Sequence, residues 1–131
     1  MAVQLARLAG ADQVIAVDPI KARRDLALAL GADAALDPLA GDVGQAIREL
    51  TVPASRQHEP AAPFPHVVGG YTDRSTEWGQ RGVDVAVEVS GNPAALHEAI
   101  RATRFGGTVC VISFYGRDAS DVHLGYEFHL N

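Results

Sequence analysis

Residues 14–19 read VIAVDP, in which four apolar residues, three of them β-branched, are followed by an acid and a proline. An apolar run of this kind is typical of a buried strand, and proline is tolerated in the first turn of a helix. The next apolar residues recur at helical spacing and precede a glycine that fits a helix C-cap (Ala22, Leu26, Ala29, Leu30 and Gly31). The stretch predicts a strand over 13–17 and a helix with Pro19 in its first turn, separated by Asp18.

The same alternation of strands and helices continues along the chain. An Ala/Leu helix precedes the stretch and ends at Gly10, and a short strand (34–36) and a helix (about 42–50) follow it. Further on, the sequence predicts a strand over 83–89, a helix capped by Asn92 with Pro93 in first position, a tight turn at 105–107, and a strand over 108–113. This order implies an α/β fold with a doubly wound parallel sheet, an incomplete Rossmann fold whose strands are buried on both faces.

Composition and charge exclude several classes of protein for this chain. With 131 residues, 47% of them hydrophobic, the chain has room for one globular core. The net charge of -5, with acids and bases mixed, argues against nucleic-acid or membrane partners, and no apolar run is long enough to span a bilayer. Cys110 is the only cysteine, which excludes an internal disulfide and suits a reducing, cytoplasmic location. Its apolar strand predicts a buried core thiol.

Residues 52–81 interrupt this pattern. They contain four prolines and a Gly69-Gly70 pair, and no hydrophobic period is sustained across them. A connection of this length is unusual in a compact domain. We therefore expect an irregular surface insertion within one partial dinucleotide-binding domain that covers residues 1–131.

Asp18 is the first candidate site residue. An acid at the end of this strand can bind the two hydroxyls of an adenosine ribose, which favours NAD because a 2′-phosphate would be repelled. Asp18 can equally be the N-cap of the helix that starts at Pro19. Arg23 and Arg24 can stack on adenine or pair with a 2′-phosphate, which keeps NADP as an alternative. For Arg24 a solvated helix face is the favoured interpretation.

Two further strand ends are candidate cofactor-binding segments. Ligands of open parallel sheets bind at the carboxyl ends of the strands, where Ser90 and Gly91 follow one strand and Val111, Ile112 and Ser113 end the next. Gly91 allows close approach of a ring to the backbone, although an ordinary strand-to-helix turn needs no ligand. Glu88 is an unusual acid in an apolar strand that either contacts a ligand or binds a neighbouring turn. No His or Cys has zinc-ligand spacing, so no metal site is predicted. The sequence contains neither a Gly-x-Ser-x-Gly nucleophile elbow nor a P-loop, and no catalytic residue is predicted.

The order of these segments along the sequence resembles that of the cofactor-binding domain of the medium-chain, zinc-type alcohol dehydrogenase family. The similar segments are AVQLARLAGA (2–11), VIAVDP (14–19), LALGADAALDP (28–38), GVDVAVEVSGNPAAL (82–96), FGGTVCVISFYG (105–116) and LGYEFHLN (124–131). The resemblance implies that Asp18 binds the adenosine ribose with Arg23 beside it. It also implies that Ser90-Gly91 and the strand end 111–113 border the nicotinamide, and that zinc belongs to a catalytic domain outside this sequence.

The chain also departs from that family. The family's glycine-rich GxGxxG loop belongs just before Ala2 and does not occur in the residues that precede Asp18. That loop supplies most phosphate contacts, so we expect a truncated domain that binds NAD weakly or not at all and is inactive alone. Two alternatives remain open: a Rossmann-like methyltransferase that uses S-adenosylmethionine, and a non-catalytic remnant or interaction module. An exposed sheet edge would favour a homo-oligomer.

Overall fold

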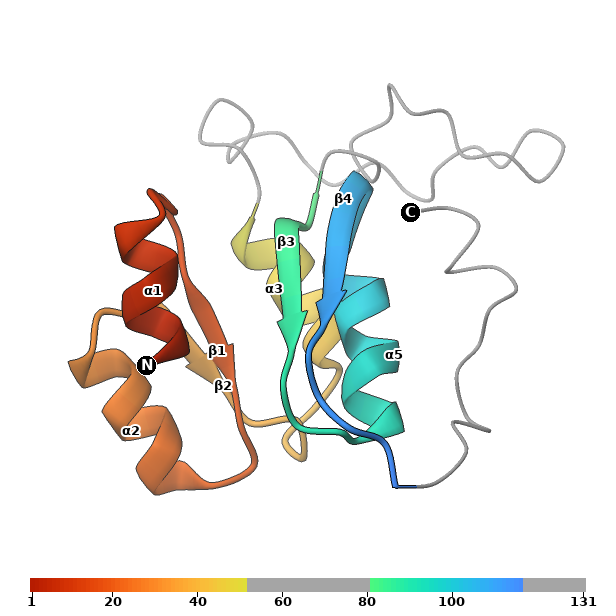
Figure 1. Ribbon diagram of the computed structural model, residues 1–131, viewed down its shortest axis with the longest axis horizontal. Coiled ribbons are helices and arrows are strands. Elements are labelled where there is room, and N and C mark those ends of the chain that lie inside the picture. Colours follow the sequence, from red (N-terminus) through yellow and green to blue (C-terminus); the bar gives the residue numbers. More distant parts are fainter. Residues whose placement is uncertain (52–80, 117–131) are drawn as a thin grey trace, which may run out of the picture. The chain divides into compact units, whose positions relative to one another are not determined.

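The computed structural model describes residues 1–51 and 81–116, and Figure 1 shows their helices and strands. The chain divides into two compact units, Met1–Val43 and Gly44–Asn131, which are considered separately below. Both units combine helices with parallel strands, as the α/β prediction requires. The predicted insertion 52–81 lies outside the described residues except for its last position, and the single partial domain remains a prediction.

The first unit contains α1 (Ala2–Leu8), β1 (Ile15–Val17), α2 (Lys21–Ala29) and β2 (Ala34–Leu36). β1 and β2 pair in parallel, with Ile15 opposite Ala34 and Val17 opposite Leu36, and α2 connects them. The predicted βαβ unit is thereby confirmed. Pro19 is not in the first turn of α2, however, because the helix begins at Lys21 after the N-cap Ile20.

Arg7 holds the turns of this unit together. Its guanidinium donates to the backbone oxygens of Gly31, Ala11 and Asp12 at 2.7–2.9 Å and to the Asp33 carboxylate at 2.5 Å. Asp33 also accepts from the Val14 amide at 2.6 Å. The hydrogen bond from the Val14 amide, followed by the hydrogen bond from Arg7, lowers the pKa of Asp33, so the carboxylate stays ionised.

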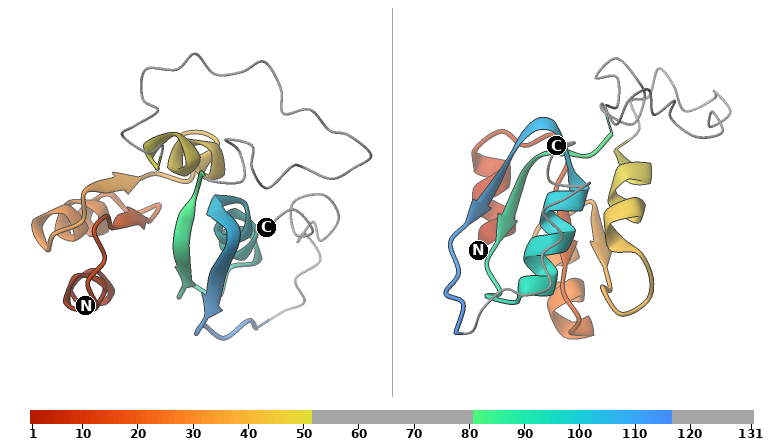
Figure 2. Two further views of the ribbon diagram at one scale, coloured as in Figure 1. Left: turned by 90° about the horizontal axis from the view of Figure 1, so that it is seen from above. Right: turned by 90° about the vertical axis from the view of Figure 1, so that its right-hand side faces the viewer.

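The second unit contains most of α3 (Val43–Leu50), together with β3 (Val83–Glu88), α5 (Pro93–Ala102) and β4 (Thr103–Val111). β3 and β4 are parallel, and α3 and α5 lie on the same side of this strand pair (Figure 2). The predicted start of α5 is confirmed: Asn92 is the N-cap, its Oδ1 accepts from the Ala94 amide at 3.1 Å, and Pro93 is the first helical residue.

Residues 105–107 do not form the predicted tight turn. They lie inside β4, whose pairing with β3 shifts between Val83, opposite Thr103, and Val85, opposite Thr108. Between these two pairs β3 advances by two residues and β4 by five, so β4 contains three extra residues there. Gly106 absorbs this irregularity at φ +69°, a conformation that favours glycine. The Gly-Gly pair therefore marks a bulge rather than a chain reversal.

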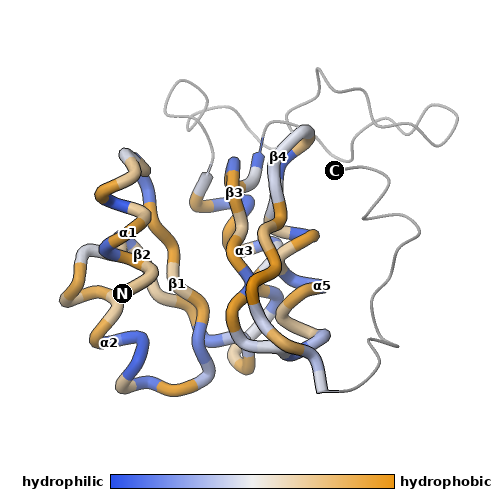
Figure 3. The backbone as a smooth tube through the Cα atoms, in the orientation of Figure 1, coloured by the Kyte–Doolittle hydropathy of each residue, from blue (hydrophilic) through white to orange (hydrophobic). Residues whose placement is uncertain are grey.

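The strands of the second unit are less buried than predicted. Ile47, Ile100 and Ala102 form its buried apolar core, and Figure 3 shows the apolar character of β3 and β4. Yet Val85 and Val87 are 56% and 52% exposed, and Cys110 is exposed rather than a buried core thiol. Within this unit α5 packs against one side of the strands and α3 lies on the same side, whereas alternate strand residues point to the other side. None of the helices in the described ranges has the length and apolarity to cross a bilayer.

Candidate functional site

Asp18 lies directly after β1, with its side chain 26% exposed. Its Oδ1 accepts from the Ile20 amide at 2.8 Å, and its Oδ2 is 3.5 Å from Nη1 of Arg23. The N-cap alternative is wrong, because α2 begins at Lys21 and its N-cap is Ile20. Asp18 instead closes the turn that precedes the helix. One carboxylate oxygen thus orders the turn, and the other faces a cation.

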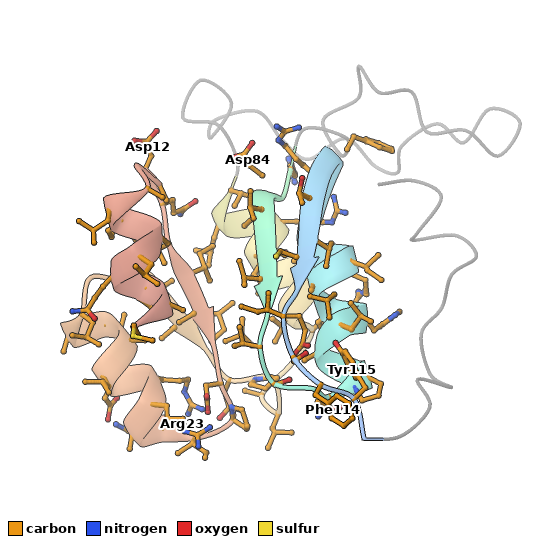
Figure 4. The ribbon with its side chains drawn as sticks, in the orientation of Figure 1. Asp12, Arg23, Asp84, Phe114 and Tyr115 are labelled. Carbon is orange, nitrogen blue, oxygen red and sulfur yellow. The ribbon has the colours of Figure 1, made fainter. Side chains whose placement is uncertain are left out.

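The two arginines of α2 have different surroundings. Arg24 is only 16% exposed and donates from Nη1 to the Asp18 backbone oxygen at 2.7 Å, while Nη2 lies 2.9 Å from Oδ2 of Asp37. The predicted solvated face is therefore wrong for Arg24, which joins α2 to the ends of β1 and β2. Arg23 is 68% exposed beside Asp18 and is labelled in Figure 4. Of the two cations, Arg23 is the one presented to solvent next to the acid.

Glu88 is the most buried acid in the described residues, at 3% exposure. Its Oε1 accepts from the Ser90 amide and hydroxyl, both at 2.6 Å, and from the Gly91 amide at 3.2 Å. Its Oε2 accepts from the Ser113 hydroxyl and from the Tyr115 hydroxyl, the latter at 2.5 Å. Five hydrogen bonds thus converge on one carboxylate from two segments of chain.

The electrostatics of this cluster favour the ionised acid. Burial raises the pKa of Glu88, but the hydrogen bonds from Ser113, Ser90 and Tyr115 outweigh burial and lower that pKa from 4.5 to about 2. Burial, and then the bond to Glu88, raise the pKa of the Tyr115 hydroxyl, which therefore remains a donor. The cluster holds a negative charge without exposing it.

The predicted nicotinamide-side residues are brought together by this cluster. Ser90 and Gly91 bind Oε1 of Glu88, and Ser113 binds Oε2. Val111 pairs with Glu88 in the strand register, and the Ile112 amide donates to the Glu88 backbone oxygen at 3.1 Å. Asp18 and Arg23 lie together in the other unit. The candidate residues therefore form two groups, one in each unit.

Glu88 and Tyr115 were not among the predicted site residues. Sequence reasoning left Glu88 between a ligand contact and a bond to a turn, and the structure shows the bond to the turn. The sequence did contain a signal for this role of Glu88. An acid in a buried strand requires hydrogen-bond donors, and Ser90, which can donate, follows two positions later. Within the described ranges, no group of three or more His, Cys, Asp or Glu residues is arranged to hold a metal ion.

A sequence model described as zinc-binding dehydrogenase matches residues 1–130. The chain belongs to the zinc-binding dehydrogenase family. It is 37% identical over its full length to the D-guloside 3-dehydrogenase of Escherichia coli (strain K12) and spans 30% of that relative. The chain thus spans less than a third of the length of curated relatives that it matches.

Solved structures of zinc-type dehydrogenases share the fold. An alcohol dehydrogenase zinc-binding domain protein from Burkholderia ambifaria is 35% identical, with a TM-score of 0.65 over 91% of this chain and 25% of its own. A zinc-binding dehydrogenase from Sinorhizobium meliloti, bound to NADP, is 34% identical, with a TM-score of 0.60 over 88% of this chain and 27% of its own. These matches confirm the Rossmann-type fold and favour a dehydrogenase over a methyltransferase.

Proposed function

We propose that this zinc-binding dehydrogenase chain forms the nicotinamide-cofactor part of an oxidoreductase that transfers a hydride between an alcohol and NAD(P). The observation that carries the proposal is Asp18 at the carboxyl end of β1, with Arg23 beside it. Ligands of parallel α/β sheets bind at that end, and an acid in this place suits the hydroxyls of an adenosine ribose. Family membership and the NADP-bound relative support the same cofactor class.

On the adenosine side, Asp18 would accept hydrogen bonds from the ribose through Oδ2, because Oδ1 is already bound to the Ile20 amide. This arrangement favours NAD. Arg23 is the cation that would meet a 2′-phosphate if the cofactor were NADP, since Arg24 is bound to Asp37. These two side chains suit the adenosine ribose of such a cofactor, because an acceptor and a cation lie together at the strand end.

On the nicotinamide side, the proposed residues are Ser90, Gly91, Val111, Ile112 and Ser113. A bound nicotinamide supplies the hydride chemistry, and this chain's share is to bind and orient it. Zinc, which would polarise the alcohol oxygen, is assigned to parts of a complete dehydrogenase that this sequence does not include. Turnover, a cytoplasmic location and homo-oligomerisation are likewise predictions for the complete protein.

Amide chemical shifts of the isotopically labelled chain test the proposal. Titration with NAD and NADP at millimolar concentrations detects binding even when the affinity is as weak as the sequence suggests. Saturable shifts at Asp18 and Arg23 would support the proposed adenosine-side residues, and shifts at Ser90, Gly91 and 111–113 would support the proposed nicotinamide-side residues. The same titration with S-adenosylmethionine is the comparison. A response to that ligand and not to NAD or NADP would contradict the dehydrogenase assignment.

A further inference from the structure

Glu88 links two chain segments that are far apart in sequence. One is the turn Ser90–Gly91 after β3, and the other is residues 113–115, which follow β4. The first segment supplies three donors to Oε1 and the second supplies two to Oε2. Figure 4 shows Tyr115 and Phe114 beyond the carboxyl end of β4, where this second segment runs.

We infer that Glu88 is a positioning residue that fastens the turn Ser90–Gly91 to residues 113–115, so that the two segments present one fixed rim to the nicotinamide half of the cofactor. The inference rests on the proposed function, and it goes beyond it by assigning a role to a residue that does not itself touch the cofactor. Rigid segments bind more tightly than mobile ones because less conformational freedom is lost on binding.

Burial and charge explain how one side chain can do this. A carboxylate that is 3% exposed loses its hydration, which is unfavourable unless its oxygens are bound. Hydrogen bonds to an ionised oxygen are about twice as strong as neutral ones, and here each oxygen has donors from a different segment. Because the pKa of Glu88 is low, the charged form persists at neutral pH and the fastening does not depend on protonation.

The backbone of the two segments is also in close contact. A Cβ added at Gly91 would lie 2.4 Å from the Phe114 backbone oxygen, so this glycine and residue 114 touch directly. The Ser90 hydroxyl, which donates to Glu88, accepts from the Asn92 amide at 3.1 Å. Asn92 in turn caps α5. The bonds around Glu88 therefore extend from the end of β4, through the turn, to the first residues of α5.

A double variant, Ser113→Ala with Tyr115→Phe, distinguishes the link between the two segments from the hydrogen bonds that Glu88 makes within its own turn. It removes the donors of one segment and leaves Glu88 with the Ser90 hydroxyl and the amides of Ser90 and Gly91. If Glu88 fastens the two segments, hydrogen exchange at those amides rises severalfold although their own acceptor is intact. The matched control is Asp84→Asn, an acid that is 79% exposed at the opposite end of β3. Unchanged exchange at Ser90 and Gly91 in the double variant would overturn the inference.

Two ligands then test the role of the rim. NAD contains the nicotinamide, whereas ADP-ribose lacks it, and both can be titrated by chemical shift. Tyr115→Phe alone leaves the proposed binding residue Ser113 in place, and in this single variant we expect NAD to bind about fivefold more weakly and ADP-ribose to bind as in the wild type. Equal weakening of both ligands, or no change for NAD, would contradict a positioning role. If the wild-type chain responds to neither NAD nor NADP, the proposed function fails, and the exchange result alone decides whether Glu88 fastens the segments.

Discussion

Arg24 binds the Asp37 carboxylate at the carboxyl ends of β1 and β2, with Nη2 2.9 Å from Oδ2. The same guanidinium donates to the Asp18 backbone oxygen at 2.7 Å. Three elements of the first unit therefore meet at one mostly buried cation. This arrangement keeps the Asp18 turn in place and distinguishes Arg24 from its neighbour Arg23.

Replacement of Arg24 is expected to destabilise the chain. Arg24→Ala removes the partner of Asp37 Oδ2 and the donor to the Asp18 carbonyl in a partly buried place, which should cost about 2 kcal/mol of unfolding free energy. Arg23→Ala is the matched control, because that side chain is 68% exposed and its loss should cost less than about 0.5 kcal/mol. Urea unfolding followed by circular dichroism measures both. Equal losses would contradict the different roles of the two arginines.

The pair of Asp18 and Arg23 should decide the cofactor preference. Asp18→Ala removes the acceptor for the ribose hydroxyls and the repulsion of a 2′-phosphate, so the ratio of NADP to NAD affinity should rise by about tenfold. Arg23→Ala should lower the same ratio. Dissociation constants from chemical-shift titrations give both ratios. A ratio that is unchanged in Asp18→Ala would show that this acid does not select the cofactor.

The helices were predictable from sequence where local signals dominate. Hydrophobic spacing located α1 and α2, and the Asn92-Pro93 pair placed the start of α5 to the residue. The start of α2 was missed because Asp18 binds the Ile20 amide and so holds Pro19 and Ile20 outside the helix. A single carboxylate can move a helix boundary by two residues, and sequence spacing does not record which amide it binds.

The remaining differences come from contacts between distant residues. The Gly106-Gly107 pair is a turn signal in isolation, yet pairing with β3 draws it into a bulged strand. Arg24 looks like a surface residue until parallel pairing brings Asp37 beside it. Glu88 has donors 25 and 27 positions away, at Ser113 and Tyr115. Each role depends on a partner that only the tertiary fold supplies.

Gly91 should tolerate no side chain. It adopts φ +69°, and an added Cβ would lie 2.4 Å from the Phe114 backbone oxygen, so Gly91→Ala combines strain with a clash against backbone. We expect a loss of about 2 to 4 kcal/mol. Gly41→Ala is the control, because an added Cβ there meets nothing within 4 Å. If thermal unfolding showed similar midpoints for both variants, the close contact at Gly91 would be wrong.

Arg48 should be the main polar support of α3. Its guanidinium donates to the backbone oxygens of Arg101 at 2.6 Å, Arg81 at 2.9 Å and Thr103 at 3.1 Å. It thus joins α3 to the end of α5, to the segment just before β3 and to the first residue of β4. Arg48→Ala should cost about 3 kcal/mol, and Arg48→Lys should recover only part, because an ammonium lacks the planar fork. Glu49→Ala, at an exposed position of the same helix, should change stability by less than about 0.5 kcal/mol. Urea unfolding of the three variants checks this order.

Glu88 should make the free energy of unfolding depend on pH. Its pKa in the folded chain is about 2, below the ordinary 4.5, so the unfolded chain takes up the proton first as the pH falls. The stabilising contribution is therefore complete above pH 4.5 and is lost progressively as the pH falls to about 2. A difference of this size corresponds to about 3 kcal/mol.

Glu88→Gln isolates that contribution, because the amide does not titrate and has nearly the same shape. The unfolding free energies of wild type and variant should differ most at neutral pH and should converge below the folded pKa, whereas titration of the other acids affects both proteins alike. Urea unfolding at a series of pH values gives the difference directly. A gap that stays constant from neutral to acid pH would mean that the Glu88 carboxyl is not held ionised by Ser90, Ser113 and Tyr115.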